Sequence, residues 1–364
     1  MPPPDLNLAL PWSTDHLPGV GGALRLTPEH FVVDEMALYE ALGEGPHLYV
    51  NLTKANLTTK EVQQRLEALF GVQRGGVGFA GLKDKNARTT QTFSIPTNAP
   101  TANDDALVAR IADALPVTIN WARRHRNKLK AGHLLGNRFR ITITEIALPP
   151  DETLARAQAI AAQLAAVGAP NYFGPQRFGG EGDNASSGYE LLTGSRSMRD
   201  RWLRQFLVSS YQSHLCNLYL ARRVDRGAFT HLWLGDVAKK HATGGIFDVA
   251  DLATDQPRFA EREISFTAPM FGSKMRPAQG EAAQLEDEIA AETGLTDANW
   301  RRMHTEGTRR MGRLFAAELD VLPHPLGLEL AFALPKGAFA TTLLREFMKD
   351  ESAALPAEEA EPFE

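Results

Sequence analysis

Hydrophobic and polar positions alternate in three segments of the chain, which predicts short β-strands. FVVDE (31–35), HLYVNL (47–52) and NRFRITITEI (137–146) are rich in β-branched and aromatic residues. Because side chains alternate across a strand, the third segment has two unlike faces. One face carries Phe139, Ile141 and Ile143, and the other carries Arg138, Arg140, Thr142 and Thr144. We therefore expect a half-buried strand with a basic, polar outer side.

Apolar residues spaced three and four apart predict helices between the strands. Val62, Leu66, Leu69 and Phe70 share one face of a helix that Thr58 or Thr59 can cap and that Gly71 ends. We expect further helices at 107–115, from the break LPPDE (148–152) to about 166, near 199–223 and in the acidic run 281–292. The segment LGLELAFALP (326–335) returns to strand alternation.

The order of these elements predicts one domain inserted into another. Strand alternation dominates up to about residue 167, whereas 168–313 begins with the Gly- and aromatic-rich NYFGPQRFGG and contains long helical stretches. A length of 364 residues fits two domains of about 100–200 residues each. We expect a discontinuous domain of 1–167 plus 314–350, an inserted domain of 168–313, and a frayed acidic tail of 351–364.

The distribution of charge adds a candidate function that the total charge hides. The formal net charge is −5, yet 121–140 holds seven Lys and Arg without an acidic residue, and 301–313 holds five Arg against one Glu. A single basic run is usually a solvated face of a protein. Two such runs favour a surface that binds the phosphates of a nucleic acid.

Several classes of protein are disfavoured by the composition. No apolar run approaches the roughly 18 residues of a membrane span, and the N-terminal sequence lacks the features of a secretory signal. Cys216 is the single cysteine, so the chain can form no intrachain disulfide. His214 and Cys216 could supply two metal ligands, but they lie in a helical pattern where ordinary packing explains them. We expect a soluble cytoplasmic protein without a metal site or a membrane partner.

The segment from Gly76 to Gly81 matches the dinucleotide-binding pattern G-x-G-x-x-G. That pattern works only between a strand and a helix, because the pyrophosphate binds at the N-terminus of the helix. Here a predicted helix precedes the glycines, and KDKNARTTQTFSI after them has no helical apolar face. We therefore reject a nicotinamide-dependent dehydrogenase.

Asp84 is the strongest candidate for a reactive side chain. It stands between Lys83 and Lys85 in a short polar loop that joins two strand-like pieces. Nearby cations favour the ionised carboxylate, as a nucleophilic aspartate requires. From this pattern alone, an aspartate in a surface turn is the more frequent interpretation.

Four blocks of the sequence resemble the signature blocks of the TruD family of tRNA pseudouridine synthases. They are GFAGLKDKNARTTQTFSI (78–95), KLKAGHLLGNRF (128–139), NYFGPQRFG (171–179) and LPKGAFATTLLRE (334–346), and FVVDE with GEGPHLYV (43–50) resembles the N-terminal block. The resemblance implies an α+β fold. A pseudouridine-synthase catalytic domain with a central, mostly antiparallel sheet would be interrupted by an inserted α/β TRUD domain. It also implies isomerisation of a uridine in tRNA, position 13 in bacterial relatives, without a cofactor.

The resemblance also assigns roles to individual residues. Asp84 matches the catalytic aspartate, and Arg25 matches its basic partner, at which Lys also occurs. Residues that match positions lining the uridine pocket are Phe31, Asn137, Phe139 and Phe339. From the basic runs, we expect the tRNA phosphates to contact Arg123, Arg124, Lys128, Arg309, Arg310 and Arg313.

Two interpretations of the function remain after these assignments. The first is a monomeric tRNA pseudouridine synthase with no obligate protein partner. The alternative is a catalytically inactive tRNA-binding protein that acts as an RNA chaperone. Loss of Asp84 or Arg25 would indicate the alternative, and both residues are present.

Overall fold

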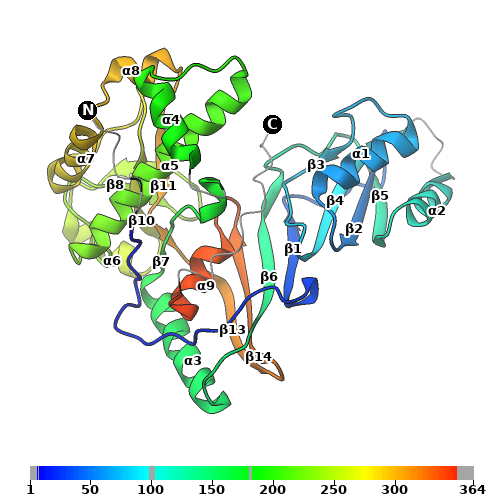
Figure 1. The fold of residues 1–364 in the computed structure, drawn as a ribbon, viewed down its shortest axis with the longest axis horizontal. Coiled ribbons are helices and arrows are strands. Elements are labelled where there is room, and N and C mark those ends of the chain that lie inside the picture. Colours follow the sequence, from blue (N-terminus) through cyan, green and yellow to red (C-terminus); the bar gives the residue numbers. More distant parts are fainter. Residues whose placement is uncertain (1–5, 7, 98–102, 180–182, 351–364) are drawn as a thin grey trace. The chain divides into compact units, whose positions relative to one another are not determined.

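The computed structural model describes residues 6, 8–97, 103–179 and 183–350, which fall into two compact units (Figure 1). The large-sheet unit consists of 20–158 and 317–337. The small-sheet unit consists of the described residues up to 19, of 159–316 and of those from 338 onward. One border falls inside helix α3 (Pro150–Val167), and another lies directly before strand β13 (Ala317–His324).

These borders lie close to the expected domain boundaries, but the termini group differently. Residues 8–19 and helix α9 (Ala340–Met348), which we expected in the catalytic domain, belong to the small-sheet unit. The expected acidic tail, 351–364, lies outside the described residues. The assignment of a catalytic and an inserted domain stays a prediction.

The large-sheet unit is built on an eight-stranded sheet. Its strands are β1 (Phe31–Ala37), β2 (His47–Lys54), β3 (Gly78–Phe79), β4 (Arg88–Pro96), β5 (Thr118–His125), β6 (Leu134–Thr144), β13 and β14 (Gly327–Pro335). The order is β13-β14-β6-β1-β4-β2-β5, with β3 paired to β4. Only β1 and β4 pair in parallel among the described strands of this sheet, and every other neighbour is antiparallel. The expected mixed α+β class with a mostly antiparallel sheet is confirmed.

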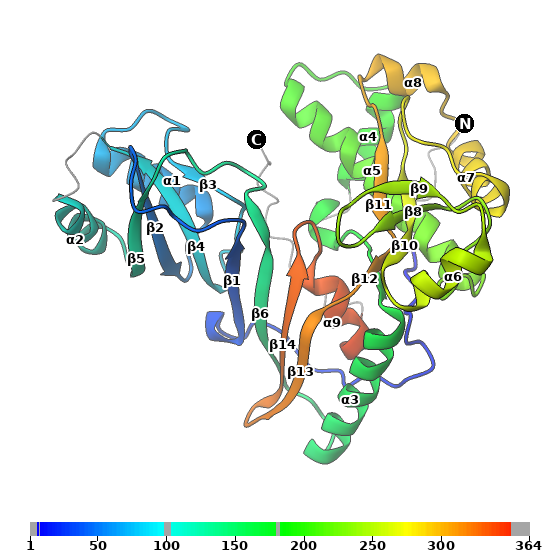
Figure 2. The ribbon, with the colours of Figure 1, turned by 180° about the vertical axis from the view of Figure 1, so that it is seen from behind.

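The C-terminal strand β14 lies between β13 and β6 (Figure 2). It pairs with β6 along its whole length, from Gly327 opposite Thr144 to Pro335 opposite Gly136. The predicted strand at 326–335 is therefore confirmed, and it belongs to the same sheet as the strands near the N-terminus.

Strand β6 confirms most of the predicted alternation. Phe139, Ile141 and Ile143 are buried, and Arg138 and Arg140 are exposed. The polar outer side was predicted wrongly at its end, where Thr142 and Thr144 are also buried. Part of the reason lies in the segment before β1, because the amide of Ala23 donates to the carbonyl oxygen of Thr144 at 2.7 Å.

Helix α1 (Thr59–Phe70) begins and ends where the sequence predicts. The Thr58 hydroxyl accepts a hydrogen bond from the Glu61 amide (3.0 Å), and the Glu61 carboxylate accepts one from the Thr58 amide (2.6 Å). This reciprocal cap satisfies two amides that the helix leaves open. Gly71 ends the helix at φ +64°, a conformation that suits glycine. The helix packs with α2 (Asp104–Ala114) on an apolar core formed with β2 and β4 (Figure 1).

The small-sheet unit contains a four-stranded sheet in the order β11-β10-β8-β9 and a two-stranded sheet, β12-β7. The strands are β7 (Ala169–Pro170), β8 (Val237–Lys240), β9 (Ile246–Asp248), β10 (Ile264–Met270), β11 (Thr308–Met311) and β12 (Arg313–Leu314). The helices are α4 (Asp183–Thr193), α5 (Arg201–Asp225), α6 (Leu252–Ala260), α7 (Gly280–Thr293), α8 (Asp297–Arg302) and α9. The long helix expected near 199–223 is α5, and the acidic helix expected at 281–292 is α7.

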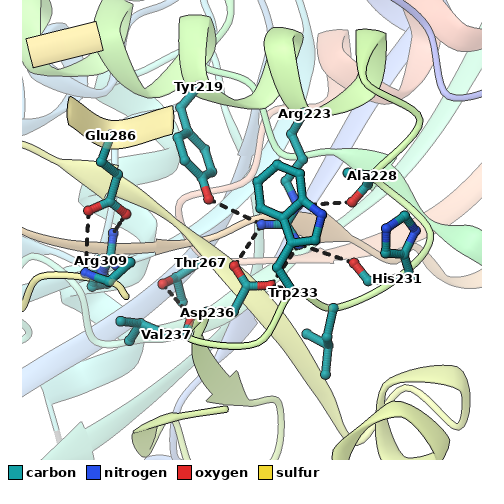
Figure 3. Close-up of polar contacts among 12 residues, drawn as sticks. Tyr219, Arg223, Ala228, His231, Trp233, Asp236, Val237, Thr267, Glu286 and Arg309 are labelled. Atoms are coloured by element: carbon teal, nitrogen blue, oxygen red, sulfur yellow. Dashed lines mark hydrogen bonds and ion pairs between the residues drawn. The ribbon is translucent and has the colours of Figure 1, made fainter. Parts of the chain in front are cut away.

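A buried ion pair links α5 to the strands of this unit (Figure 3). Arg223 is 0% exposed and donates to both carboxylate oxygens of Asp236, at 2.6 and 2.7 Å. Its guanidinium also donates to the hydroxyl of Tyr219 and lies 4.2 Å from the ring centre of Trp233 and 3.8 Å from that of Phe266. The buried charge of Arg223 is tolerated because its N–H groups donate to the carboxylate of Asp236 and to other nearby oxygen atoms.

Helix α5 also contains the two residues considered as metal ligands. His214 and Cys216 are buried among core side chains, and burial raises the pKa of the Cys216 thiol to about 12. Within 8–97, 103–179 and 183–350, no group of three or more His, Cys, Asp or Glu could hold a metal ion. None of the helices in the described part of the chain has the length and hydropathy needed to cross a membrane.

Candidate active site

Asp84 lies in the loop between β3 and β4, and the main chain of this loop is held at several points. The Lys83 amide donates to the Thr59 hydroxyl at 2.9 Å, and the Asn56 amide donates to the Lys85 carbonyl at 3.0 Å. The buried ammonium of Lys54 lies 3.4 Å from the carbonyl oxygen of Asp84. The G-x-G-x-x-G match therefore leads into an anchored loop and then into β4, as we expected.

Arg25 forms an ion pair with Asp84. Its Nη2 donates to Oδ2 of Asp84 at 3.1 Å, with the Arg25 side chain 7% exposed and that of Asp84 31% exposed. The arginine is thus mostly shielded from water, while the carboxylate keeps a surface that a ligand can reach. A fixed guanidinium favours the ionised carboxylate and orients it.

The backbone of Arg25 adopts an uncommon conformation. Its φ is +61°, in the left-handed region that few residues other than glycine adopt without strain. In this conformation the guanidinium carbon lies 4.0 Å from the ring centre of Phe31. The guanidinium of Arg25 therefore has the ring of Phe31 as a partner in addition to the carboxylate of Asp84.

Phe31 and Phe139 lie on the same face of the sheet, as the register of β1 and β6 requires. Val33 of β1 pairs with Phe139 of β6, and the rings of Phe31 and Phe139 lie edge to face with centroids 6.4 Å apart. Phe139 also stacks on Phe332 of β14 at 5.3 Å. One face of each ring is thus occupied, that of Phe31 by Arg25 and that of Phe139 by Phe332. The sequence placed Phe332 in a strand but did not indicate that it supports this cluster.

Asn137 precedes Phe139 by two residues on β6, so both point to the same face of the sheet. It pairs with Glu35 of β1 and with Leu334 of β14. Its Oδ1 is buried and has no hydrogen-bond partner within the described residues. Buried acceptors are nearly always satisfied in folded proteins. This oxygen is therefore an acceptor without a protein donor among the described residues, and it is closed to solvent in this structure.

Phe339 belongs to the other unit. It lies directly before α9, and its ring centre is 6.0 Å from that of Phe173. Its predicted place in a uridine pocket stays a prediction.

The basic run 121–140 is less open than its sequence suggests. Arg123 is exposed on the edge strand β5. Arg124 is buried, and its Nε lies 3.0 and 2.9 Å from the two carboxylate oxygens of Asp104. Lys128 is half-buried, with its ammonium on the carbonyl oxygen of Gly75. Arg124 is therefore a structural ion-pair partner and not an exposed phosphate ligand.

The second basic run also supplies buried side chains. Arg309 pairs with Glu286 at 2.5 Å (Figure 3). Arg310 donates to the main-chain and side-chain oxygens of Asn171, and burial lowers its pKa to about 10. Burial lowers the pKa of Arg313 to about 9, and its guanidinium carbon lies 3.3 Å from the ring centre of Phe259. These three arginines hold the small-sheet unit together instead of forming an open basic surface.

Direct contacts therefore join four of the predicted site residues in one unit: Arg25, Phe31, Asp84 and Phe139. Asn137 lies beside them on the sheet face. A partly exposed carboxylate held by a guanidinium can act on a carbon that carries positive charge, such as the anomeric carbon of a sugar. A buried, unsatisfied amide oxygen nearby suits a ring N–H. The residue types thus fit a nucleoside better than a simple sugar.

Comparison with known proteins finds a family and relatives that match nearly the whole chain. The family model "tRNA pseudouridine synthase D (TruD)" matches residues 9–197 and 185–347. A tRNA pseudouridine synthase D of Thermus thermophilus is 46% identical over 356 residues, which are 97% of this chain and 95% of that protein. One from Anaeromyxobacter dehalogenans is 45% identical over 96% of this chain and 99% of its own length.

A solved structure supports the fold independently. The crystal structure of the putative tRNA pseudouridine synthase D from Methanosarcina mazei matches with a TM-score of 0.77, covering 96% of this chain and 99% of that one at 24% identity.

The family model and the relatives define this chain as an isomerase of the pseudouridine-synthase type. With the family model and the relatives matched over nearly its whole length, the chain belongs to the TruD family of tRNA pseudouridine synthases. The resemblance seen in the sequence blocks is thereby confirmed.

Proposed function

We propose that this chain converts a uridine of tRNA, at position 13, to pseudouridine, and that Asp84 is the residue that acts on the sugar. The reaction breaks the bond between C1′ and N1, turns the uracil and joins it again through C5. The uracil loses its C5 proton to water and N1 takes up a proton, with no change of oxidation state, so the proposal requires no cofactor. The observation that supports it is the Arg25–Asp84 pair, which lies within the part of the chain that the family model matches.

Asp84 has two ways to promote this reaction. Its carboxylate can attack C1′ as uracil departs and form a covalent adduct, or it can remove the 2′ proton as uracil departs, which gives a glycal. Both routes pass through a sugar with oxocarbenium-like charge, which a carboxylate stabilises. Both also need the carboxylate ionised and correctly aimed, and the buried guanidinium of Arg25 supports the two requirements.

Recognition of the base is proposed for the face of β1 and β6. A uridine must leave its stack to reach Asp84, which costs a few kcal/mol. Asn137 Oδ1 can accept a hydrogen bond from the N3–H of uracil, because it has no partner among the described residues. Phe31 and Phe139 are 1% and 7% exposed, so we propose them as the apolar floor beneath the flipped base, with Phe332 behind Phe139. Phe339 is proposed as a further ring of the pocket on the resemblance alone.

The surface for tRNA phosphates is proposed for the exposed part of the first basic run. Arg123 and Lys128 remain candidates, since Arg124, Arg309 and Arg313 are buried and the half-buried Arg310 is bonded to Asn171. We propose residues 1–167 plus 314–350 as the catalytic domain and residues 168–313 as the inserted one. We also propose that the protein acts as a monomer in the cytoplasm.

Asp84→Asn tests the proposal directly, because it removes the charge and keeps the shape. We expect the wild-type protein to release tritium from 5-tritiated uridine in an unmodified tRNA transcript without added cofactor. Asp84→Asn should bind the same tRNA in a filter assay but release no tritium. Full activity of this variant would refute the role of Asp84. Binding without turnover by the wild type would favour the RNA-chaperone alternative.

A further inference from the structure

A second charged pair lies directly beside the catalytic loop. The ammonium of Lys83 is 2.7 Å from Oε2 of Glu35, and each side chain is only 3% exposed. Lys83 is the residue before Asp84, whereas Glu35 lies in β1, 48 positions earlier in the chain. The other carboxylate oxygen of Glu35 accepts a hydrogen bond from the Thr92 amide of β4 at 3.3 Å.

Stability alone does not account for this pair. Lysine and glutamate are seldom fully buried, because removing both charges from water offsets most of their attraction. Replacing a buried ion pair by apolar residues of similar size is often neutral or stabilising. A pair in this position can instead act by fixing where the loop sits on the sheet.

The contacts around Asp84 form a closed circuit that includes Glu35. The carboxylate of Asp84 binds Arg25, the guanidinium of Arg25 lies over Phe31, and Phe31 is four residues before Glu35 on the same face of β1. Glu35 then returns to the loop through Lys83. Asp84 is thereby tied to β1 from both sides.

The strand register extends this circuit to the base-recognition face. Glu35 is the direct cross-strand partner of Asn137 in the β1–β6 ladder, and Val33 is that of Phe139. Any shift of the loop against Glu35 therefore changes the distance between the reacting carboxylate and the proposed uracil acceptor. When a flipped nucleoside is bound, the carboxylate of Asp84 must reach the sugar while the amide oxygen of Asn137 reaches the base.

From this geometry we propose that Glu35 is a positioning residue, which sets the place of Asp84 relative to Asn137 by holding Lys83. The proposal rests on the function proposed above. Without the carboxylate charge, the buried Lys83 ammonium loses its partner and draws the loop toward water. A displacement of about 1 Å at a catalytic group can lower a rate about 100-fold.

The test uses single-turnover tritium release, tRNA affinity and thermal unfolding of the full chain. In Glu35→Gln we expect the rate constant at saturating enzyme to fall about 10- to 100-fold. The dissociation constant for tRNA should stay within about twofold, because Glu35 is too buried to contact RNA.

Glu67→Gln is the matched control. Glu67 is also a buried carboxylate of the same unit, on α1, and accepts a hydrogen bond from the Val77 amide. The rate constant of tritium release by Glu67→Gln should equal that of the wild type.

The double variant Glu35→Gln/Lys83→Met separates positioning from stability. It removes both buried charges, so the midpoint of thermal unfolding should return to or exceed that of the wild type. If Glu35 positions Asp84, the double variant stays slow although it is stable. If the pair is merely structural, the rate recovers together with the stability, and the proposal is wrong.

The remaining outcomes are also decisive. A Glu35→Gln protein as fast as the wild type overturns the proposal, and so does a failure of both variants to fold, which would make the pair a folding requirement. Absence of tritium release from the wild type would instead contradict the proposed function. An active wild type, an inactive Asp84→Asn and a fast Glu35→Gln would contradict the positioning role alone.

Discussion

Replacement of Arg25 by Met isolates the contribution of the guanidinium to the site. Met keeps a side chain of similar length and can still pack on the ring of Phe31, so the apolar contact is largely retained. The unusual φ of +61° is unfavourable for both residues and cancels in the comparison. The change therefore removes the charge and the hydrogen bond to Asp84 at 3.1 Å.

The magnitude follows from the geometry of that pair. Two unit charges 3.1 Å apart attract by about 5 kcal/mol at an effective dielectric constant of about 20, an upper bound on the net effect. A hydrogen bond to a charged group contributes about 1.5–3 kcal/mol net. Because Asp84 is 31% exposed and water can replace part of the interaction, we expect the lower part of that range, about 1.5–2 kcal/mol. This corresponds to a roughly 10- to 30-fold loss at about 1.4 kcal/mol per tenfold.

Single-turnover tritium release with Arg25→Met and Arg25→Lys measures this loss. Arg25→Lys keeps the charge but not the planar fork, so it should be faster than Arg25→Met and slower than the wild type. The thermal midpoint of each variant serves as the control for folding. A rate for Arg25→Met within about twofold of the wild type would show that Asp84 acts without help from the guanidinium.

Two further predictions concern the framework of the large-sheet unit. In Gly136→Ala, the new Cβ would lie 2.0 Å from the carbonyl oxygen of Leu334. The β6–β14 ladder would have to shift beside Asn137, so urea titration should show lower stability and tritium release should slow; unchanged values of both would contradict the register. His125 stacks between Tyr39 and Tyr49, at 5.1 and 4.7 Å, and burial, with the nearby charge of Arg126, lowers its pKa. The unfolded chain then binds more protons as the pH falls below about 6.5, so the free energy of unfolding should decrease from about pH 7.5 to about pH 5.5. His125→Phe should weaken this dependence in urea titrations, although His47, whose pKa is also lowered, leaves a part of it; an unaltered slope would exclude His125 as its source.

Local patterns in the sequence predicted the local structure well. The cap at Thr58, the stop at Gly71 and the alternation of Phe139 and Ile141 all depend on neighbours a few residues away. Such signals are present in the sequence because helix ends and strand faces obey fixed periods.

The charged residues were harder to assign, because their partners are far away in the sequence. Arg309 lies 23 residues from Glu286, and Lys83 lies 48 residues from Glu35. A basic run with distant acidic partners looks the same in the sequence as an exposed phosphate-binding run. The resemblance to a family located Asp84 and Arg25, but it did not indicate that Phe332 supports Phe139 or that Arg124 is buried on Asp104.

The pairing of β14 with β6 has a consequence for how the protein is made. Strand β6 ends at residue 144, and β14 begins at residue 327, so the ribosome must add the whole intervening segment before the two can meet. At about 5–20 residues per second this takes roughly 10–40 s. During that interval β6 presents an open row of amides and carbonyls, a template on which nascent chains can aggregate. The edge of β6 that β14 covers therefore stays unpaired until residue 335 has left the ribosome.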